Sequence, residues 1–448
     1  MTSVLVPSIG GHSNEASASV PAARRSVTII GQGYVGLPLA MEAVGQDHTV
    51  CGYEIDAGKV AGLSAGRSHV EDIADATLAR ALARGRYRVT ANADNAFSAF
   101  DVAVITVPTP LKDGLPDLSF VEEAARTLAP YLRPGRTLRQ TVILESTTYP
   151  GTTEEVLVPL LEAGSGLTAG VDFHVGFSPE RIDPGNKIWT LRSTTKVVSG
   201  LTPACLARVE EFYRSVVDDV HPVADVKSAE MAKIIENTFR HVNIALVNEL
   251  AILAHELGID IWEALGAAAS KPFGYMKFTP GPGVGGHCLP IDPLYLSHRV
   301  EKALGKTFRF VELAHDINEH QPDYVVQRIT AGLNRHRKAV NGSRILLVGL
   351  AYKANTADTR ETPSSRVVEL LGQLGAKVEI VDPHVAVAEH LGAPVYPRPD
   401  ADLIAEYDAV VILTDHQAID YAALAADARY VLDTRHVIDS PFANVEFI

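Results

Sequence analysis

The stretch Ser26-Val-Thr-Ile-Ile-Gly-Gln-Gly-Tyr-Val-Gly36 decides the fold of the first part of the chain. Its β-branched run predicts a short strand that stops at Gly31, and the helix formers from Leu37 to Val44 predict a helix directly after the turn. In a Gly-x-Gly-x-x-Gly turn the first glycine permits the bend, the second admits a pyrophosphate, and the third lets helix pack on strand. The free N–H groups at the helix start also favour a phosphate. We therefore expect a dinucleotide to contact Gly31, Gly33, Tyr34, Val35 and Gly36.

An acidic residue follows this turn at about the spacing that dinucleotide-binding folds use for their ribose-binding carboxylate. Glu54 ends the second strand candidate, His48 to Tyr53, and lies 23 positions after Gly31. A carboxylate at this place accepts hydrogen bonds from a ribose 2′-OH and repels a 2′-phosphate, which favours NAD over NADP. Asp56 is a rival for this role, although its position suits a helix N-cap better. The alternative for the whole motif is a glycine turn in an α/β protein without a cofactor.

Strands and helices alternate through the rest of the first part and again near the end. Further strand candidates are Val102 to Val107, Thr141 to Leu144 and Phe173 to Phe177, with helical stretches at Leu78 to Ala83 and Phe120 to Leu132. After Gly342 the strand candidates are Arg344 to Leu350, Lys377 to Val381, Ala409 to Thr414 and Tyr430 to Leu432, with a helix from Pro363 to Leu374. Such alternation predicts parallel, doubly wound sheets.

A long helical stretch separates the two α/β parts. From Asp225 to about Leu257, apolar residues recur at three- and four-residue steps. The fold expected is α/β, with two Rossmann-like doubly wound domains joined by a long central helix. The expected divisions are a mobile, disordered extension at 1–25, a first domain at 26–224, a helical linker at 225–330 and a second α/β domain at 331–448.

Length and composition exclude several classes of protein. The chain has 448 residues, a net charge of −14, and 46% hydrophobic and 21% charged residues. The composition is that of an ordinary globular protein. Nucleic acid or an anionic membrane as the main partner would require clustered Lys and Arg, and this net-acidic chain has no such cluster. We therefore expect neither as a partner. Three scattered cysteines make neither a disulfide framework nor a four-thiolate site, so no metal is expected. We find no signal peptide and no apolar run near the ~18 residues of a membrane helix, so we expect a cytoplasmic protein without a membrane partner.

One cysteine lies in a loop that suggests chemistry. Cys288 is part of Gly281-Pro-Gly-Val-Gly-Gly-His-Cys-Leu-Pro-Ile-Asp292. So many glycines can bring backbone close to a ligand and leave a thiol exposed, which favours a nucleophile. A lone cysteine without this context is more often a small core residue. His287 and Asp292 are candidates to orient the thiol, with loop packing as their alternative.

Polar residues recur at positions where doubly wound folds bind ligands. Lys233 and Asn237 project from one face of the long helix. A polar face on a helix between two domains suggests a wet cleft, and the alternative is a solvated helix face with ordinary charges. Glu145-Ser-Thr147 and Ser178-Pro-Glu180 each follow a strand candidate, where ligands bind unless the residues serve only as turns and caps. In the last domain, Lys353 and Arg360 are suited to phosphate.

This set of motifs resembles the UDP-sugar 6-dehydrogenases, the NAD-dependent four-electron dehydrogenases of UDP-glucose, UDP-N-acetylglucosamine and UDP-N-acetylmannosamine. The resemblance covers about Ser26 to Arg435. The motifs stand in the family's order, and they are Gly31 to Pro38, Val107-Pro-Thr-Pro110, Glu145 to Thr147, Ser178 to Glu180, Lys233 with Asn237, Gly285 to Asp292, Ala351-Tyr-Lys-Ala-Asn355 and Asp358-Thr-Arg360. It implies an NAD-binding domain, a helical linker that pairs two subunits into a homodimer or higher homo-oligomer, and a UDP-binding domain.

The resemblance also implies roles for individual residues. The Cys288 thiolate would capture a sugar aldehyde as a thiohemiacetal, which becomes a thioester and is hydrolysed to a carboxylate. Lys233, with Asn237 beside it, would stabilise the oxyanion, while Asp292, Thr147 and Glu180 would hold water and move protons; which carboxylate is the base stays open. Implied NAD contacts include Lys59, Thr109, Thr147 and Arg360. Implied UDP-sugar contacts are Glu180, Arg181, Lys233, Asn237, Lys271, Phe273, Gly274, Tyr275, Gly285, Lys353 and Arg435.

The flanks of these motifs resemble the UDP-N-acetylglucosamine branch. The UDP-glucose enzymes have a second glutamate four residues after the Ser-Pro-Glu acid, where this chain has Pro184. Lys277 departs from the proline that the N-acetylglucosamine branch usually has in that segment. The alternatives are UDP-glucose or UDP-N-acetylmannosamine as substrate, a non-catalytic nucleotide-sugar binding protein, and a two-electron hydroxyacid dehydrogenase, which would not need the cysteine loop.

Overall fold

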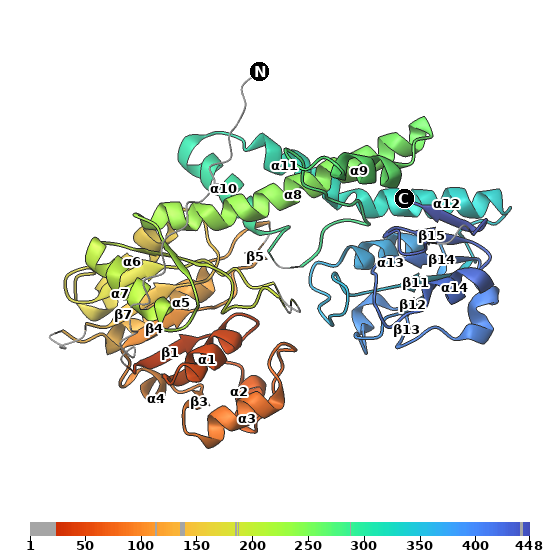
Figure 1. The fold of residues 1–448 in the computed structure, drawn as a ribbon. Helices are drawn as coiled ribbons and strands as arrows, with labels where there is room; N and C mark the ends of the chain where they lie inside the picture. Colours follow the sequence, from red (N-terminus) through yellow and green to blue (C-terminus); the bar gives the residue numbers. More distant parts are fainter. Residues whose placement is uncertain are drawn as a thin grey trace.

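The computed structural model describes residues 24–112, 114–134, 139–183, 186, 188–286, 288–439 and 442–448. Most of the extension expected at 1–25 therefore lies outside the described residues, as do Pro184 and His287. Figure 1 shows two α/β units on either side of a gap in the ribbon, with one long helix running across both of them.

The first unit is built on an eight-stranded sheet with the order β10-β9-β8-β7-β4-β1-β2-β3. Its strands are β1 (Ser26–Ile30), β2 (Thr49–Tyr53), β3 (Tyr87–Thr90), β4 (Val102–Ile105), β7 (Thr141–Leu144), β8 (His174–Phe177), β9 (Lys196–Gly200) and β10 (Val220–Pro222). Every strand predicted for this unit is present, and β1, β2, β4, β7 and β8 pair in parallel. The β8 to β9 pair is antiparallel.

Helices cover both faces of this sheet. They are α1 (Gly36–Gly45), α2 (Ala57–Ser64), α3 (Asp75–Ala83), α4 (Ala93–Phe97), α5 (Ser119–Leu128), η1 (Ala129–Tyr131), η2 (Thr153–Leu157), α6 (Val158–Ser165) and α7 (Pro203–Arg214). A small hairpin, β5 (Leu111–Lys112) with β6 (Leu115–Pro116), follows β4. Two hydrophobic clusters form the core, one on each face of the sheet. The predicted doubly wound architecture is therefore correct.

The long helix α8 (Val226–Leu257) begins at Asp225, whose side chain caps it by accepting the Ser228 N–H. It ends at Gly258 in the left-handed conformation, a common helix C-cap. It is followed by α9 (Ile261–Ala269), α10 (Asp292–Leu304), α11 (Arg309–Glu319) and α12 (Gln321–Arg335), and α11 packs along α8.

Both faces of α8 carry apolar side chains. The face buried against the rest of the molecule combines polar side chains, among them Lys233 and Asn237, with apolar ones such as Ile234 and Val247. Apolar side chains on the other face are exposed, and these are Ile235, Phe239, Leu246, Leu250, Leu253 and Leu257. The period therefore predicts the helix correctly, although most of the apolar face lies on the surface of the single chain.

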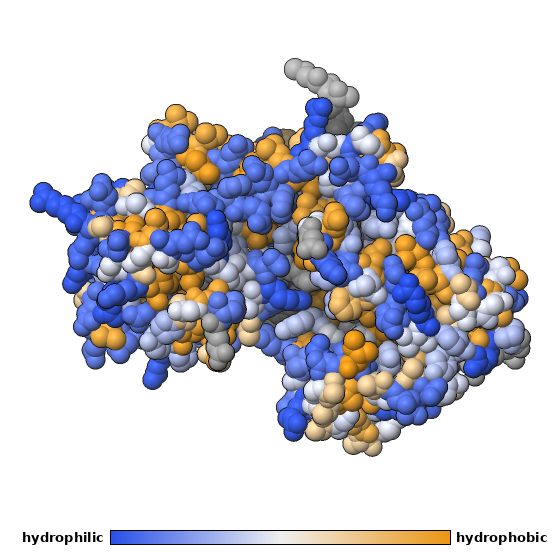
Figure 2. Space-filling model, turned by 180° about the vertical axis from the view of Figure 1, so that it is seen from behind, coloured by the Kyte–Doolittle hydropathy of each residue, from blue (hydrophilic) through white to orange (hydrophobic). Residues whose placement is uncertain are grey.

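The second unit has a six-stranded parallel sheet with the order β13-β12-β11-β14-β15-β16. Its strands are β11 (Arg344–Val348), β12 (Lys377–Val381), β13 (Val395–Tyr396), β14 (Ala409–Ile412), β15 (Val431–Asp433) and β16 (Val445–Phe447). Its helical elements are α13 (Pro363–Gln373), η3 (Glu389–Leu391), η4 (Ala401–Glu406) and α14 (Tyr421–Asp427). Seen from behind in Figure 2, the molecule has two lobes with a hollow between them.

Candidate active site

A cleft of about 1210 Å³ lies between the two units, with α8 forming one wall. Most of the first unit's lining follows the carboxyl ends of β1, β2, β4, β7 and β8, the side where doubly wound sheets bind ligands. The other walls are the cysteine loop and a loop of the second unit that includes Tyr352 and Arg360. Predicted site residues in the lining are Gly31, Gly33, Tyr34, Val35, Glu54, Lys59, Thr109, Thr147, Glu180, Arg181, Lys233, Asn237, Gly285, Cys288, Asp292, Lys353, Arg360 and Arg435.

The glycine turn after β1 is shaped for a dinucleotide. Gly31 has φ of +89°, and a Cβ there would lie 2.9 Å from the Thr106 carbonyl oxygen. A Cβ on Gly36, which lies beneath the cleft lining, would overlap the Gly31 carbonyl oxygen, so this glycine permits the close packing of helix on strand. A Cβ on Gly33 would meet nothing within 4 Å, which leaves the turn open to a pyrophosphate.

Glu54 lies beside this turn at the end of β2. Its side chain is nearly buried, and its two oxygens accept the backbone N–H groups of Gln32 and Asp56, each at 3.0 Å. These bonds fix the carboxylate in the cleft wall and leave lone pairs for a ribose diol. Asp56 instead caps α2 by accepting the Lys59 N–H at 2.9 Å, as its position in the sequence indicates.

Five predicted catalytic side chains meet in the middle of the cleft. Lys233 Nζ lies 3.4 Å from Glu180 Oε2, and Asn237 Nδ2 donates to Asp292 Oδ2 at 2.5 Å. Asp292 is the first residue of α10, and its backbone N–H donates to the Cys288 carbonyl oxygen at 2.8 Å. One turn of α8 separates Lys233 from Asn237, so the helix and the cysteine loop together bring the cation, the amide, the carboxylates and the thiol to one place.

Burial and charge set the proton affinities of this group. Burial raises the pKa of the Asp292 carboxyl to about 7, against the opposing effects of the Lys233 cation and the Asn237 hydrogen bond. Burial also raises the pKa of Glu180, which Lys233 lowers. Burial disfavours the Lys233 cation, but Glu180, Cys288 and Asp292 outweigh this effect and hold its pKa above the ordinary value. At neutral pH the site therefore combines a fixed cation with a carboxyl poised to exchange a proton.

The Cys288 thiol is half-buried in the loop before α10. Burial, reinforced by the Asp292 carboxylate, raises the pKa of this thiol to about 12, while Lys233 acts in the opposite direction. The thiol is therefore protonated in the protein without ligands, and its use as a nucleophile requires a neighbouring base that takes the proton.

The second unit brings cations to the opposite wall of the cleft. Lys353 Nζ lies 2.6 Å from Asp183 Oδ1 of the first unit, and the Arg360 guanidinium, held by Asp358, lies 5.0 Å above the Tyr34 ring. Arg435 Nε donates to the Leu413 carbonyl oxygen at 2.7 Å. Diphosphate binding by these cations stays a prediction.

Four predicted substrate contacts lie elsewhere. Lys271, Phe273, Gly274 and Tyr275 are exposed after α9 and do not line the cleft of their own chain. Phe273 is 71% exposed, with Lys271 Nζ 4.9 Å above its ring. These contacts therefore stay predictions.

The cleft also has lining residues that the sequence did not single out as site residues. They include Thr106, Asp183, Glu236, Tyr352 and Asp415. Tyr352 adjoins Lys353 in a strand-to-loop crossing, which is a signal that could have found it. No local pattern marks the others.

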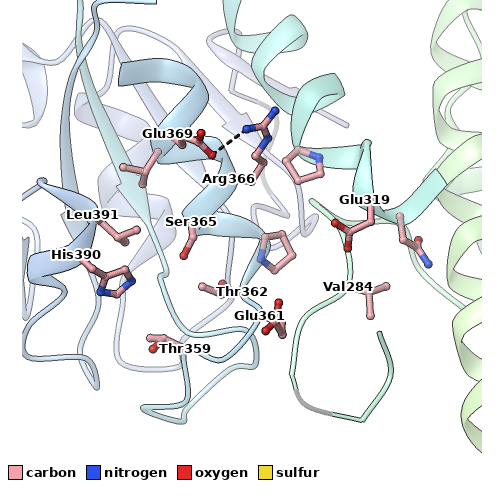
Figure 3. Close-up of a pocket in the computed structure, with 14 residues that line it drawn as sticks. Val284, Glu319, Thr359, Glu361, Thr362, Ser365, Arg366, Glu369, His390 and Leu391 are labelled. Carbon is pink, nitrogen blue, oxygen red and sulfur yellow. Dashed lines mark hydrogen bonds and ion pairs between the residues drawn. The ribbon is translucent and has the colours of Figure 1, made fainter. Parts of the chain in front are cut away.

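A second cavity of about 620 Å³ borders the cleft across the cysteine loop, and Val284 lines both. Figure 3 shows its walls, which include α13 and the η3 turn. Three glutamates face it together with Arg366, which pairs with Glu369 at 2.8 Å. None of the predicted site residues lines this cavity, so the reaction centre is assigned to the larger cleft.

Comparison with known proteins places this geometry in a family. Three domain models of one family match, namely an NAD binding domain at residues 25–217, a central domain at 227–320 and a UDP binding domain at 346–440. The chain belongs to the UDP-glucose/GDP-mannose dehydrogenase family. The predicted family, the NAD cofactor and the dehydrogenase class are thereby confirmed. The UDP binding domain supports a UDP-sugar as the substrate of this nucleotide-sugar dehydrogenase.

Relatives of this dehydrogenase carry names for different sugars. The chain is 37% identical to a UDP-N-acetyl-D-glucosamine 6-dehydrogenase of Pseudomonas aeruginosa over 392 residues, which is 87% of this chain and 90% of that protein. A solved UDP-D-ManNAc dehydrogenase from Pyrococcus horikoshii matches with a TM-score of 0.84 and 33% identity, covering 94% of this chain and 98% of that one. A UDP-glucose dehydrogenase from Pyrobaculum islandicum matches with a TM-score of 0.82 and 28% identity, covering 95% and 97%.

The described part of the dehydrogenase lacks two other features. No helix there is both long and apolar enough to cross a membrane. Among the same residues, no group of three or more His, Cys, Asp or Glu side chains could hold a metal ion.

Proposed function

We propose that this dehydrogenase oxidises the C6 hydroxyl of UDP-N-acetylglucosamine to the carboxylate in two steps, with Cys288 holding the intermediate. The observation that carries this proposal is the placing of the Cys288 thiol beside Lys233 and Asp292 in the cleft that also contains the dinucleotide turn. Bound NAD supplies the hydride acceptor for each of the two oxidations. A two-electron dehydrogenase would need no thiol at this position.

In the first oxidation the chain's residues position the alcohol and take up its proton. Lys353, Arg360 and Arg435 hold the diphosphate, which directs the sugar toward Lys233. The hydroxyl proton passes through ordered water, held by Thr147 and Glu180, to a carboxylate while the hydride leaves C6. The product of this step is the aldehyde.

In the second oxidation the aldehyde is held covalently. The Cys288 thiol gives its proton to Asp292, and its sulfur adds to the aldehyde carbon to form a thiohemiacetal. Lys233 and Asn237 stabilise the negative oxygen in a water-poor site. Loss of the second hydride from the carbon that bears this negative oxygen gives a thioester, with no further proton to remove. Water attacks this thioester to release the carboxylate and return the thiol.

The choice of sugar rests on the loop that follows β8. Ser178-Pro-Glu-Arg-Ile-Asp-Pro-Gly-Asn186 has Pro184 where the UDP-glucose enzymes that it resembles have a glutamate. We infer from the sequence that proline at this position gives an acetamido group more room than a long charged side chain would. The 37% identity to a protein named for UDP-N-acetyl-D-glucosamine supports the same choice.

A sugar panel tests the substrate. We expect kcat/KM, measured by NADH formation at saturating NAD, to be higher for UDP-N-acetylglucosamine than for UDP-glucose or UDP-N-acetylmannosamine. A pocket that hydrogen-bonds the acetamido group leaves buried partners unpaired with glucose, which lowers specificity by about two orders of magnitude. A preference for UDP-glucose or the manno epimer would overturn the sugar assignment alone. A protein that binds UDP-sugars without forming NADH would refute the catalytic proposal.

The exposed apolar face of α8 supports a second proposal, a homodimer. Ile235, Leu246 and Leu253 are each about half exposed on one side of the helix, and Phe310 and Leu313 on α11 are also exposed. Apolar area of this extent on a helix pair is typical of an interface. In such a dimer the segment Lys271 to Tyr275, which lies outside its own cleft, would reach the site of the other copy. Sedimentation of the intact protein tests this, and a monomer at all concentrations would contradict it.

A further inference from the structure

A buried ion pair lies directly behind the catalytic carboxylate Glu180. Lys196, the first residue of β9, is 2% exposed, and Glu145, directly after β7, is fully buried. Lys196 Nζ donates to Glu145 Oε1 and, at 3.0 Å, to the carbonyl oxygen of Pro179. Pro179 immediately precedes Glu180, so the ammonium group holds the backbone from which the catalytic side chain projects.

The surroundings of this pair satisfy its other polar atoms. Tyr213 donates its hydroxyl to Glu145 Oε2 at 2.6 Å, and its ring lies 5.3 Å from Lys196 Nζ. Burial and the Glu145 charge both raise the pKa of Tyr213, so this phenol stays a hydrogen-bond donor. The carboxylate therefore has a partner at each oxygen.

Stability alone does not explain why a protein keeps a buried ion pair of this kind. Replacement of such pairs by well-packed apolar side chains is often neutral or stabilising, because desolvating two charges offsets their attraction. The position of this pair supplies a reason, since Glu180 is also faced by Lys233, Asp292 and Cys288 across the cleft. Lysine and carboxylate alternate from Glu145 through Lys196, Glu180 and Lys233 to Asp292.

We infer that Lys196 is a positioning residue for Glu180, anchoring it through the Pro179 carbonyl and, with Glu145, setting the charge against which Glu180 exchanges its proton. The inference rests on the proposed function for the role of Glu180. In support of it, the Lys196 cation lowers the pKa of Glu180 and the Glu145 carboxylate raises it, both within a site where burial is the largest influence. Removal of the Lys196 charge should therefore raise the pKa of Glu180, and removal of the Glu145 charge should lower it.

The test uses the full-length protein with Lys196→Met, Lys196→Arg and Glu145→Gln. Carboxyl carbon NMR, with Glu180→Gln to identify the signal, reports the titration midpoint of Glu180 without any substrate. We expect Lys196→Met to raise the midpoint by about one pH unit and Glu145→Gln to lower it. Lys196→Met should reduce kcat, while KM changes by less than about twofold. Lys196→Arg, which keeps the positive charge, should have the kcat and the Glu180 midpoint of the unmodified protein.

Controls separate this role from a purely structural one. Arg25→Met removes another buried cation of the same unit, whose partner Glu211 lies away from the cleft, and should leave the Glu180 midpoint unchanged. If a single variant does not fold, Lys196→Met/Glu145→Gln removes both charges together and should still lower kcat, because the Pro179 anchor is lost. An unchanged midpoint in folded Lys196→Met, or unchanged kcat in the double variant, overturns the inference. Failure of the unmodified protein to oxidise any UDP-sugar would refute the proposed function, while the midpoint would still test Lys196.

Discussion

Asp292→Asn is expected to make the protein more stable while it abolishes turnover. The Asp292 carboxyl is 2% exposed and accepts one hydrogen bond from Asn237, which an asparagine oxygen could also accept. Burial raises its pKa from an ordinary 3.8 to about 7. The folded protein therefore holds an ionised group near neutral pH in a place that disfavours the charge, and the amide removes that charge without changing the shape.

The sign and size of the effect follow from proton linkage. Because the folded pKa is raised, the folded state binds more protons than the unfolded chain between about pH 4 and pH 7, and the stability of the unmodified protein falls as pH rises through that range. Each pH unit in this window corresponds to about 1.4 kcal/mol. The advantage of Asp292→Asn should thus grow by about 2 to 3 kcal/mol between about pH 5 and pH 8. This is about 5 to 10 °C in Tm.

Differential scanning calorimetry of both proteins at the two pH values measures this difference, and NADH formation follows activity. Asp427→Asn is the matched control, because Asp427 is exposed on α14 and its replacement should alter Tm at neither pH. An Asp292→Asn variant whose Tm differs from the unmodified protein by the same amount at both pH values would refute the reasoning. Full activity in this variant would remove Asp292 from the proton transfers.

Three further substitutions test other parts of the site. Cys288→Ala should abolish uronate formation and leave NAD affinity, measured by calorimetry, within about twofold, because the thiol and the glycine turn lie on different loops. Cys288→Ser should accumulate a slowly hydrolysed oxygen ester that is visible by intact mass. Normal turnover in the alanine variant would contradict covalent capture. Glu54→Ala should narrow the preference for NAD over NADP in steady-state kinetics, since the carboxylate repels a 2′-phosphate; equal use of both by the unmodified protein would refute this role. Leu250→Glu on α8 should dissociate the proposed dimer in sedimentation, whereas Leu374→Glu, an exposed leucine on the second unit, should not.

Local patterns in the sequence were sufficient for the architecture. The run from Ser26 to Gly36 predicts strand, turn and helix, because β-branched residues and glycines restrict the backbone within a few positions. The same reasoning finds five strands of the first sheet, four strands of the second and the start of α8 at Asp225. The strands β3, β9, β10, β13 and β16 and the small β5–β6 hairpin were missed, since each has at most five residues and no long apolar run marks it.

Much of the site also follows from sequence, since each motif lies after a strand and parallel strands end at one edge. The glycine turn and Glu54 could be assigned in this way. The meeting of Cys288 with Lys233 required the resemblance to a family, because the residues are 55 positions apart and no local rule joins them.

Only the tertiary structure decided the electrostatics and the faces of the helices. A lysine at the start of a strand gives no sign that it is buried, yet Lys196 contacts Glu145 and Pro179 once β9 returns beside β8. The raised pKa of Asp292 likewise depends on burial by several elements. The period of α8 predicts an apolar stripe but not its direction, because a helix can turn either face to its own chain. The face with Lys233 and Asn237 is the buried one, because these side chains and apolar neighbours such as Ile234 pack against the rest of the chain.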